Sequence, residues 1–409
     1  MPAHATRLIA AMCTAKVGNM AGTMVFPGLL PILQVEWALS NTEAGWINGA
    51  FFAGYGALVP ILVSYTDRID ARKVYLASAA LGAVAMFGFA ALAEGFWTAL
   101  IFRVLTGISF AGTYMPGLKL LGERLSGAAQ TRAVSFYTAT GAAGMAFSVL
   151  LSGLAGDTMH WRWAAALTGL GPLLAVPLTA LAIGPAARRP GPVGAPVRVW
   201  DFRPVLRNRP AMGYMLGYAV HCWELFGYWG WVVAYLAFAL SLHGTEAVPF
   251  SAQHIAAVAL LAGLPASVLG NEGALRLGRR RAVSYYMIGS ALVGVVLGFG
   301  SGWPMAVVAF LAIVYGATVM SDSASLTAGM VAAARDGEQG RTMALHSFLG
   351  FGVAFIAPIA FGAVLDLAGG GPMAWGFAFM VLAVVPLTGP LWLYAFGPRR
   401  AAEVIETER

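Results

Sequence analysis

The sequence predicts an all-α integral membrane protein whose twelve transmembrane helices form two six-helix repeats. Hydrophobic residues make up 59% of the 409 positions and charged residues only 11%, whereas an ordinary soluble domain has roughly 25% charged residues. The mean hydropathy of +0.74 agrees, and apolar stretches repeatedly reach the ~20 residues that cross a hydrocarbon core of ~30 Å. A soluble fold of this length cannot bury so much apolar surface, so the bilayer is the solvent for most of the chain.

Long apolar runs, interrupted by charge, glycine or proline, define the twelve spans. The first is interpreted as an uncleaved helix, because Lys16 interrupts its apolar region and the run continues to Leu33. The second has a clear start signal, since Ser40 and Glu43 form an S-x-x-E capping box. The spans lie near 8–33, 43–65, 74–94, 96–118, 133–155, 163–184, 211–240, 252–274, 282–299, 303–331, 342–366 and 373–396.

The positions of lysine and arginine predict the orientation. If the amino terminus is cytoplasmic, 22 of the 25 cations fall in inner segments, and the other three are Lys16, Arg103 and Arg162. Such an excess is typical of cytoplasmic loops, so both termini are predicted to lie in the cytoplasm. The chain is predicted to cross the cytoplasmic (inner) membrane many times. The net charge of +7 is spread over short clusters between apolar spans, which does not favour a nucleic-acid partner.

A polar stretch rich in proline, glycine and arginine divides the chain. It is predicted to be a cytoplasmic linker over 187–210, between an N-terminal bundle, 1–186, and a C-terminal bundle, 211–397, with a cytoplasmic tail over 398–409. A shift of 209 residues places five residues of the first bundle on identical residues of the second without a gap. They are Gln130, Arg132, Gly141, Gly153 and Asp157, which fall on Gln339, Arg341, Gly350, Gly362 and Asp366. The bundles are therefore predicted to be parallel repeats, as in one large class of transporters.

The segment YTDRIDARK, residues 65–73, resembles the loop between the second and third helices of the major facilitator superfamily. The acidic residue and the cations of that loop are matched by Asp67, Arg68, Arg72 and Lys73. In the family this loop pairs with neighbouring helix ends and holds one state of the transport cycle. The resemblance therefore implies a gating role for these four residues.

Two further segments extend the resemblance over most of the chain. RVLTGISFAG, residues 103–112, is similar to a pattern of the family's fourth helix, and HWRW, residues 160–163, is similar to the turn before its sixth helix. The resemblance implies secondary transport by alternating access, with a central cavity lined by the first, fourth, seventh and tenth helices. The fifth helix lacks the Gly-Pro pair that is associated with proton-driven drug antiporters of the family.

Ionisable side chains inside spans are costly, by ~2.5–3.5 kcal/mol at a helix centre on translocon scales, so they usually face a bundle interior or a wet cavity. Polar neighbours at helical spacing turn some of them into stripes, as Lys16 and Asn19 do on the first helix. The candidate substrate-binding residues are Lys16, Asn19, Arg103, Tyr214, Tyr218, Tyr315 and Asp322.

Structural alternatives stay open for several of these residues. Arg103 is alternatively a structural cation that binds backbone, and Lys16 alternatively extends to the cytoplasmic surface. Asp322 alternatively caps or kinks the tenth helix through the local SDSAS sequence. His346, on the eleventh helix, is expected to be a packed, hydrogen-bonded histidine.

Proton coupling is assigned to His221, Glu224 and Asp322. Histidine titrates near neutrality, and burial together with nearby charge controls whether a carboxylate keeps its proton. His221 and Glu224 lie one helical turn apart, so they are the preferred coupling pair.

The leading functional hypothesis is proton-coupled transport of a small organic anion or zwitterion by a monomer surrounded by lipid. The first alternative is an efflux pump for lipophilic or cationic compounds. The second, from another class, is a non-transporting assembly or sensor protein with the transporter fold. An enzyme is not expected, because the sequence has no dense group of histidines and acids at one membrane face. The sequence shows no metal-ligand spacing and no phosphate-binding glycine loop, so neither a metal nor a cofactor is expected.

Overall fold

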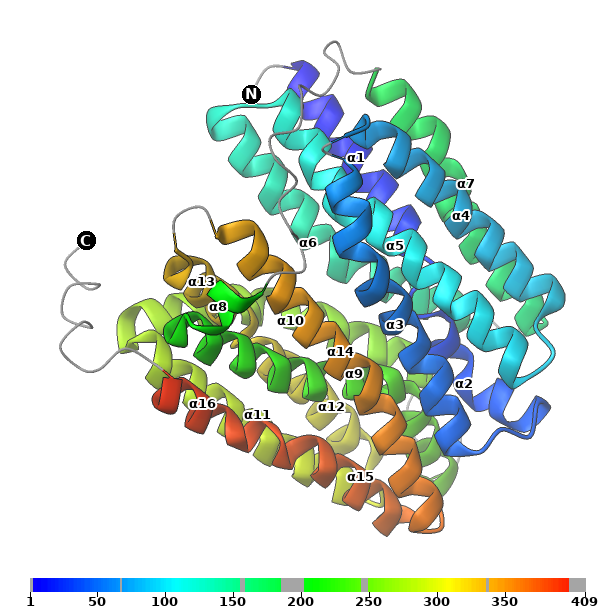
Figure 1. Ribbon diagram of the computed structural model, residues 1–409. Helices are drawn as coiled ribbons and strands as arrows, with labels where there is room; N and C mark the ends of the chain where they lie inside the picture. Colours follow the sequence, from blue (N-terminus) through cyan, green and yellow to red (C-terminus); the bar gives the residue numbers. More distant parts are fainter. Residues whose placement is uncertain are drawn as a thin grey trace.

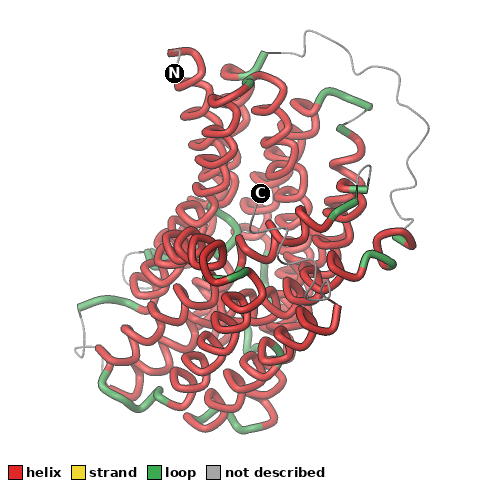
Figure 2. Tube along the Cα trace, turned by 90° about the vertical axis from the view of Figure 1, so that its left-hand side faces the viewer, coloured by secondary structure: helices red, strands yellow, loops and turns green. Residues whose placement is uncertain are grey.

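The computed structural model describes residues 3–66, 68–154, 159–184, 202–243, 249–335 and 338–396. Within these ranges the chain is helical and has no β-strand, as Figure 2 shows. Twelve helical segments of the described residues are long and apolar enough to cross a membrane, from His4–Glu36 to Pro372–Phe396. The predicted all-α class with twelve spans is confirmed, and each segment coincides with one predicted span to within several residues.

The helices fall into two groups along the chain (Figure 1). The first group consists of α1 (Ala3–Met20), α2 (Val25–Glu36), α3 (Asn41–Tyr65), α4 (Ala71–Leu92), α5 (Phe96–Arg124), α6 (Gly127–Ser152) and α7 (Trp161–Ala182). The second group consists of α8 (Arg203–Leu206), α9 (Arg209–His243), α10 (Ala252–Leu277), α11 (Arg279–Phe299), α12 (Met305–Met320), α13 (Ser323–Ala333), α14 (Gln339–Leu367), α15 (Pro372–Val384), η1 (Pro386–Thr388) and α16 (Gly389–Phe396).

The capping box predicted at the start of the second span is confirmed. The amide of Glu43 donates to Ser40 Oγ over 3.1 Å, and the amide of Ser40 donates to Glu43 Oε2 over 2.9 Å. Two of the amide groups that a helix start leaves without an intrahelical partner are thereby satisfied within this segment.

The first span consists of two helices, because α1 and α2 are separated by turns at residues 21–24. Pro27 has no amide N–H, so the carbonyl of Thr23 lacks the donor that a continuous helix would supply. Arg103 replaces that donor from α5: its Nη1 lies 2.9 Å from Thr23 O and 3.4 Å from Gly22 O. The sequence analysis predicted the span but not the break.

The tenth span is also interrupted, between α12 and α13 at Ser321 and Asp322. Asp322 occupies the position before α13, but its side chain makes no capping hydrogen bond there. The alternative that Asp322 marks a kink is therefore correct, whereas the alternative that its carboxylate caps the helix is wrong.

The two groups of helices meet mainly through α3 and α14, which lie side by side in Figure 1. A Cβ atom added to Gly45 would lie 2.4 Å from Pro358 O, and one added to Gly49 would lie 2.3 Å from Phe355 O. Glycine is thus required at both positions, because the two backbones are in contact. This contact lies toward the end of the bundle where α3 begins and α14 ends, here called the distal end.

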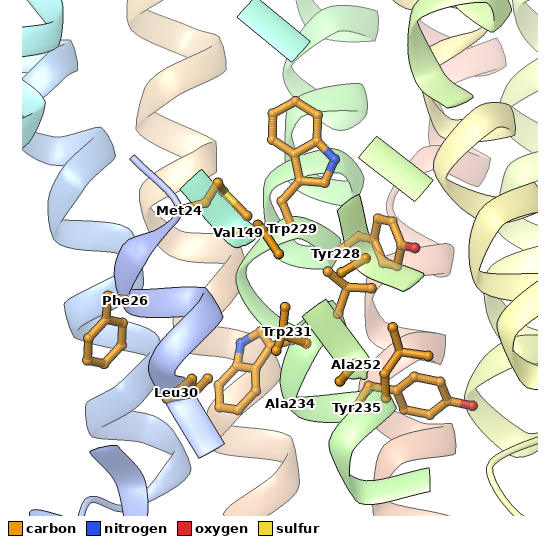
Figure 3. Packing of buried hydrophobic residues seen from close by; sticks show 14 of the residues in the cluster. Met24, Phe26, Leu30, Val149, Tyr228, Trp229, Trp231, Ala234, Tyr235 and Ala252 are labelled. Carbon is orange, nitrogen blue, oxygen red and sulfur yellow. The ribbon is translucent and has the colours of Figure 1, made fainter. Parts of the chain in front are cut away.

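Large apolar side chains fill the junction beside this contact. Figure 3 shows Met24, Leu30 and Val149 of the first group facing Trp229 and Trp231 of the second. The indole of Trp231 is fully buried and donates to Pro358 O over 3.0 Å. The distal junction is therefore a packed core shared by both groups.

The cytoplasmic location of the termini and the repeat relation between the bundles stay predictions. Of the predicted linker, residues 187–201 lie outside the described residues, as does the whole predicted tail over 398–409. The remainder of the linker contains α8, and α9 begins at Arg209.

We predict that Arg103→Met lowers the free energy of unfolding by about 1–3 kcal/mol, because it leaves the Thr23 and Gly22 carbonyls without their donor. Adding Pro27→Ala to this variant restores an amide N–H at the break and should recover part of the loss. Thermal unfolding in detergent measures both effects. An unchanged melting temperature for Arg103→Met, with normal yield, would show that the guanidinium does not hold the break.

Candidate functional site

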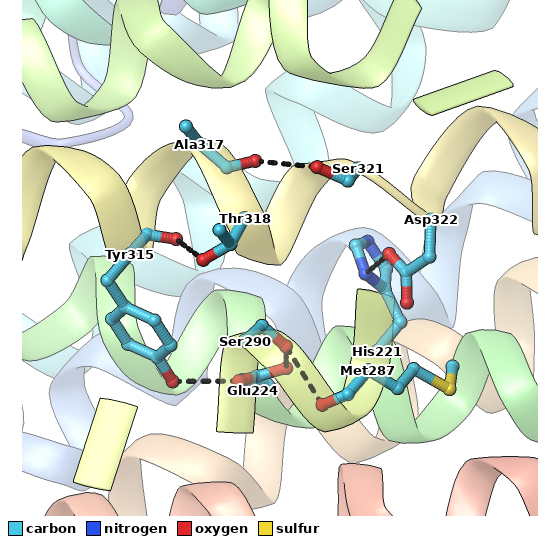
Figure 4. Close-up of polar contacts among 9 residues, drawn as sticks. All are labelled: His221, Glu224, Met287, Ser290, Tyr315, Ala317, Thr318, Ser321 and Asp322. Carbon is cyan, nitrogen blue, oxygen red and sulfur yellow. Dashed lines mark hydrogen bonds and ion pairs between the residues drawn. The ribbon is translucent and has the colours of Figure 1, made fainter. Parts of the chain in front are cut away.

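The described part of the second group contains a cluster of buried ionisable side chains (Figure 4). His221 projects from α9, and Asp322 projects from the break between α12 and α13. Their nearest atoms, His221 Nδ1 and Asp322 Oδ1, are 2.7 Å apart, and both side chains are almost fully buried. The contact is an ion pair by distance, without the alignment of a regular hydrogen bond. His221 Nε2 has no hydrogen-bond partner among the described residues.

Glu224 lies one turn further along α9 and has different partners. Its Oε2 accepts a hydrogen bond from Ser290 Oγ over 3.0 Å, and its Oε1 accepts one from the Tyr315 hydroxyl over 3.1 Å. The residue is only 2% exposed. The His221–Glu224 pair expected from spacing is thus replaced by two units, His221 with Asp322 and Glu224 with two hydroxyl groups.

Tyr218 and His346 extend this cluster toward α14. The Tyr218 ring stacks on His346 with a centroid separation of 3.8 Å and on His221 with a separation of 5.7 Å. His346 is 6% exposed, and its Nδ1 has no hydrogen-bond partner within the described ranges. The histidine is packed as expected, but Nδ1 does not supply the expected hydrogen bond.

In the first group, Lys16 is enclosed by aromatic rings. Its Nζ lies 4.5 Å from the centroid of Tyr114 and 4.7 Å from that of Tyr137. The ammonium donates to Tyr137 O over 2.5 Å, and Thr138 O lies 3.4 Å away. Lys16 is 3% exposed, so the alternative that it extends to the surface is wrong. No carboxylate pairs with it among the residues that the structure describes, and cation–π contact offsets part of its desolvation.

Asn19 lies one turn after Lys16 on α1 and is 8% exposed. Its Nδ2 donates to the Tyr75 hydroxyl over 2.9 Å. Its Oδ1 has no donor among the described residues, so one acceptor remains available one helical turn from Lys16.

The remaining predicted substrate-binding residues are Tyr214 and Arg103. The Tyr214 ring packs against Gly329 of α13, where a Cβ atom would lie 2.5 Å from it. Arg103 binds the break in the first span, as its structural alternative proposed, and lies 5.0 Å from the Phe51 ring centroid.

The predicted gating loop is described in part, since Asp67 lies outside the described residues. The Arg72 guanidinium donates to Ala180 O over 3.1 Å, close to the end of α7. Arg68 and Lys73 are exposed. The gating role therefore stays a prediction.

The cations and acids that the sequence analysis combined into one site occupy two clusters. Lys16 and Asn19 contact α4, α5 and α6, whereas the His221, Glu224 and Asp322 cluster contacts α11, α12 and α14. Within the described ranges no hydrogen bond or ion pair joins the two clusters. A central cavity shared by both stays a prediction.

Four residues of these clusters were not predicted to belong to the site: Tyr75, Tyr114, Tyr137 and Ser290. Ser290 is the hydroxyl residue in the apolar stretch MIGSALVG of α11, which is the signal that could have identified it. The three tyrosines are buried or partly buried on separate helices, and their positions in the sequence do not indicate that they converge on α1.

Comparisons with known proteins show which family the chain resembles over much of its length. The protein spinster homolog 3 of Danio rerio is 24% identical over 174 residues, which are 41% of this chain and 35% of that protein. The protein spinster homolog 1 of Homo sapiens is 24% identical over 210 residues, 50% of this chain and 38% of the relative. The puromycin resistance protein pur8 of Streptomyces alboniger is 25% identical over 136 residues, 33% of this chain and 27% of the relative. The chain thus spans less than two fifths of the length of these relatives.

Solved structures show the same fold over nearly the whole chain. A bacterial homolog of the human lysosomal transporter Spinster, in an inward-facing and unoccupied conformation, has a TM-score of 0.72 at 15% identity, covering 100% of this chain and 98% of its own. The nucleoside transporter NupG has a TM-score of 0.74 at 11% identity, covering 97% of this chain and 100% of its own. Residues 12–271 match the family model of the Major Facilitator Superfamily. Because this match covers more than half of the sequence, the chain belongs to the Major Facilitator Superfamily.

Proposed function

We propose that the protein is a secondary active transporter that moves a small organic anion or zwitterion by alternating access and couples this movement to protons. The observation that carries the proposal is the division of buried charge. The first bundle holds the cation Lys16 without a carboxylate partner among the described residues, and the second holds two protonatable units. Buried ionisable groups in a membrane protein generally belong to substrate or proton pathways.

Lys16 supplies the basis for anion recognition. An ammonium has three N–H donors, and the contacts at 2.5 and 3.4 Å with the Tyr137 and Thr138 carbonyls are neutral. A substrate carboxylate or phosphate would provide the missing opposite charge. Asn19 Oδ1, one helical turn along α1 from Lys16, can accept a hydroxyl or ammonium hydrogen, which fits a zwitterion or a hydroxylated anion.

The second bundle supplies the basis for proton coupling. Glu224 is contacted by neutral hydroxyls, so it can exist with or without its proton without breaking an ion pair. The contact between His221 and Asp322 is an ion pair only when the imidazole carries a proton. Gain or loss of one proton therefore changes what holds α9 against the α12–α13 break.

We assign the conformation to the inward-facing state of the cycle. With the amino terminus in the cytoplasm, the distal end is the outer end, and the contact between α3 and α14 closes it. The related structure with a TM-score of 0.72 is also described as inward-facing. In this proposal Asp67, Arg68, Arg72 and Lys73 act at the opposite, cytoplasmic end, in the outward-facing state.

The proposal places the protein in the cytoplasmic (inner) membrane as a multi-pass monomer surrounded by lipid. Its partners are the substrate and protons, and it requires no cofactor and no nucleic acid. Positive charge in the predicted cytoplasmic segments favours this placement.

Efflux of lipophilic or cationic compounds is the second candidate, and aromatic contacts across the bundles favour it. Phe52 lies 4.4 Å from Phe226, and Tyr55 lies 4.2 Å from Phe351, as ring centroids. One relative is named a puromycin resistance protein, and another, from Arabidopsis thaliana, a probable sphingolipid transporter. Lys16 disfavours a purely cationic substrate, whereas an anion with an apolar body satisfies both the lysine and the rings.

We predict that Lys16→Met weakens the binding of organic anions at least tenfold, about 1.4 kcal/mol, because the variant lacks the positive charge that pairs with the anion. Liposome counterflow with a panel of organic anions and cationic dyes first identifies a substrate and then compares the variants. Arg162→Met, which removes a cation that binds Ala90 O and the Trp161 ring in the same bundle, is the matched control and should retain transport. Equal loss in both variants, or dye transport without anion transport, contradicts the anion hypothesis.

We predict that Glu224→Gln and His221→Ala abolish the stimulation of uptake by a pH gradient and leave counterflow exchange measurable. The reason is that each variant removes one protonatable unit and keeps the fold of α9. Uptake into liposomes with and without a gradient measures this. Ser284→Ala, which removes a buried hydroxyl bonded to its own helix, is the control. If uptake by both site variants depends on the pH gradient as fully as uptake by the unmodified protein, the assignment of proton coupling is wrong.

A further inference from the structure

The carboxylate of Asp366, in the last turn of α14, binds the start of α3 across the boundary between the bundles. Its Oδ1 accepts from the amide N of Asn41 over 3.0 Å and from Asn41 Nδ2 over 2.8 Å. Its Oδ2 accepts from the amide N of Thr42 over 2.8 Å and from Thr42 Oγ1 over 2.6 Å. One side chain of the second bundle thus receives four hydrogen bonds from two consecutive residues of the first.

The start of α3 is built to receive an external carboxylate. Its capping box satisfies the amides of Ser40 and Glu43 and leaves those of Asn41 and Thr42 without an intrahelical acceptor. The partial positive charge of a helix amino terminus stabilises an anion at this position. Gln34 Nε2 donates to Asn41 Oδ1 over 3.0 Å, which turns the Asn41 amide so that its Nδ2 points to Asp366.

The contact lies at the edge of the closely packed seam between α3 and α14. A Cβ atom added to Gly362, one turn before Asp366, would lie 2.1 Å from Asn41 O. The other hydrogen bonds described across this end are neutral, from Asn48 Nδ2 to Gly230 O and from Gln253 Nε2 to Gly28 O. Separation of the bundles at the distal end therefore requires that the charged Asp366 leave α3. Its predicted repeat counterpart, Asp157, lies outside the described residues.

We propose that Asp366 is a latch that holds the distal end closed, and that its release from Asn41 and Thr42 is a required step when the transporter opens at this end. The inference rests on the alternating-access cycle proposed above. Asp366 is exposed, so water replaces the four hydrogen bonds when the latch opens. The latch therefore biases the equilibrium between the two states and keeps it reversible.

The test measures the opening of the distal end directly, in the full-length protein and without substrate. Cys13 and Cys222 are replaced by alanine, and spin labels are attached to cysteines at two exposed positions, Val35 at the end of α2 (83% exposed) and Leu242 at the end of α9 (45% exposed). Pulsed electron–electron double resonance gives the distance distribution between the labels. Asp366→Ala should raise the ratio of open to closed molecules at least tenfold.

The matched control is Glu43→Ala, because Glu43 also caps the start of α3 but through bonds within the first bundle. It should leave the distance distribution unchanged. Equal shifts in both variants would mean that a weakened helix start, and not a lost connection between bundles, opens the distal end, and would overturn the latch. An unchanged distribution in Asp366→Ala would overturn it as well.

If Asp366→Ala yields no folded protein, Thr42→Val carries the same test. It removes one of the four bonds at nearly constant volume, so a smaller shift in the same direction, roughly threefold, is expected, and no shift overturns the proposal. Failure of the latch is distinguishable from failure of the proposed function. A shifted distance distribution without counterflow of any anion or dye supports the latch and contradicts transport. Normal counterflow with an unshifted distance distribution supports transport and contradicts the latch.

Discussion

Hydrocarbon offers no hydrogen-bond partner, so the backbone polar groups that this chain carries into the membrane must be satisfied by the chain itself wherever they face lipid. Three buried donors show how this is met. Arg103 binds the Thr23 carbonyl, Tyr228 binds Ala312 O over 2.7 Å, and Trp231 binds Pro358 O. Each donor joins helices that are distant in sequence. The hydrogen bonds that satisfy buried polar groups therefore also determine which helices pack together, and the ionisable clusters contribute to this packing.

The two bundles satisfy their buried ionisable groups with different kinds of partner. In the first, the cations are satisfied by backbone carbonyls and aromatic faces, as Lys16 is by Tyr137 and Tyr114. In the second, the acids are satisfied by side chains, as Glu224 is by Ser290 and Tyr315. The buried charges of the two bundles thus have partners of different kinds, a difference that the identical residues of the predicted repeat do not reveal.

What the sequence could predict depended on how far apart the interacting residues are. The capping box of Ser40 and Glu43 is local, so its spacing predicted its hydrogen bonds. The spans followed from the long apolar runs of the sequence, which are local as well. The partner of His221 could not be predicted in this way, because residues one turn apart on α9 contact different neighbouring segments. Helices that are apolar around most of their circumference carry little information about their rotation, and the contact of Asp366 with α3 depends on such rotation in both bundles.

The broken first span has a mechanical consequence. Its first segment, α1, packs on α6 and α7 of its own bundle, whereas its second segment, α2, also packs on α9 of the other. The span is thus anchored at both sides of the boundary, with four residues, 21–24, between its two rods. When the bundles change their inclination, a rigid helix would have to detach from one of them. A helix with a break can bend at these turns and keep its contacts with both bundles. Arg103 continues to supply a hydrogen-bond donor to the carbonyls of the break.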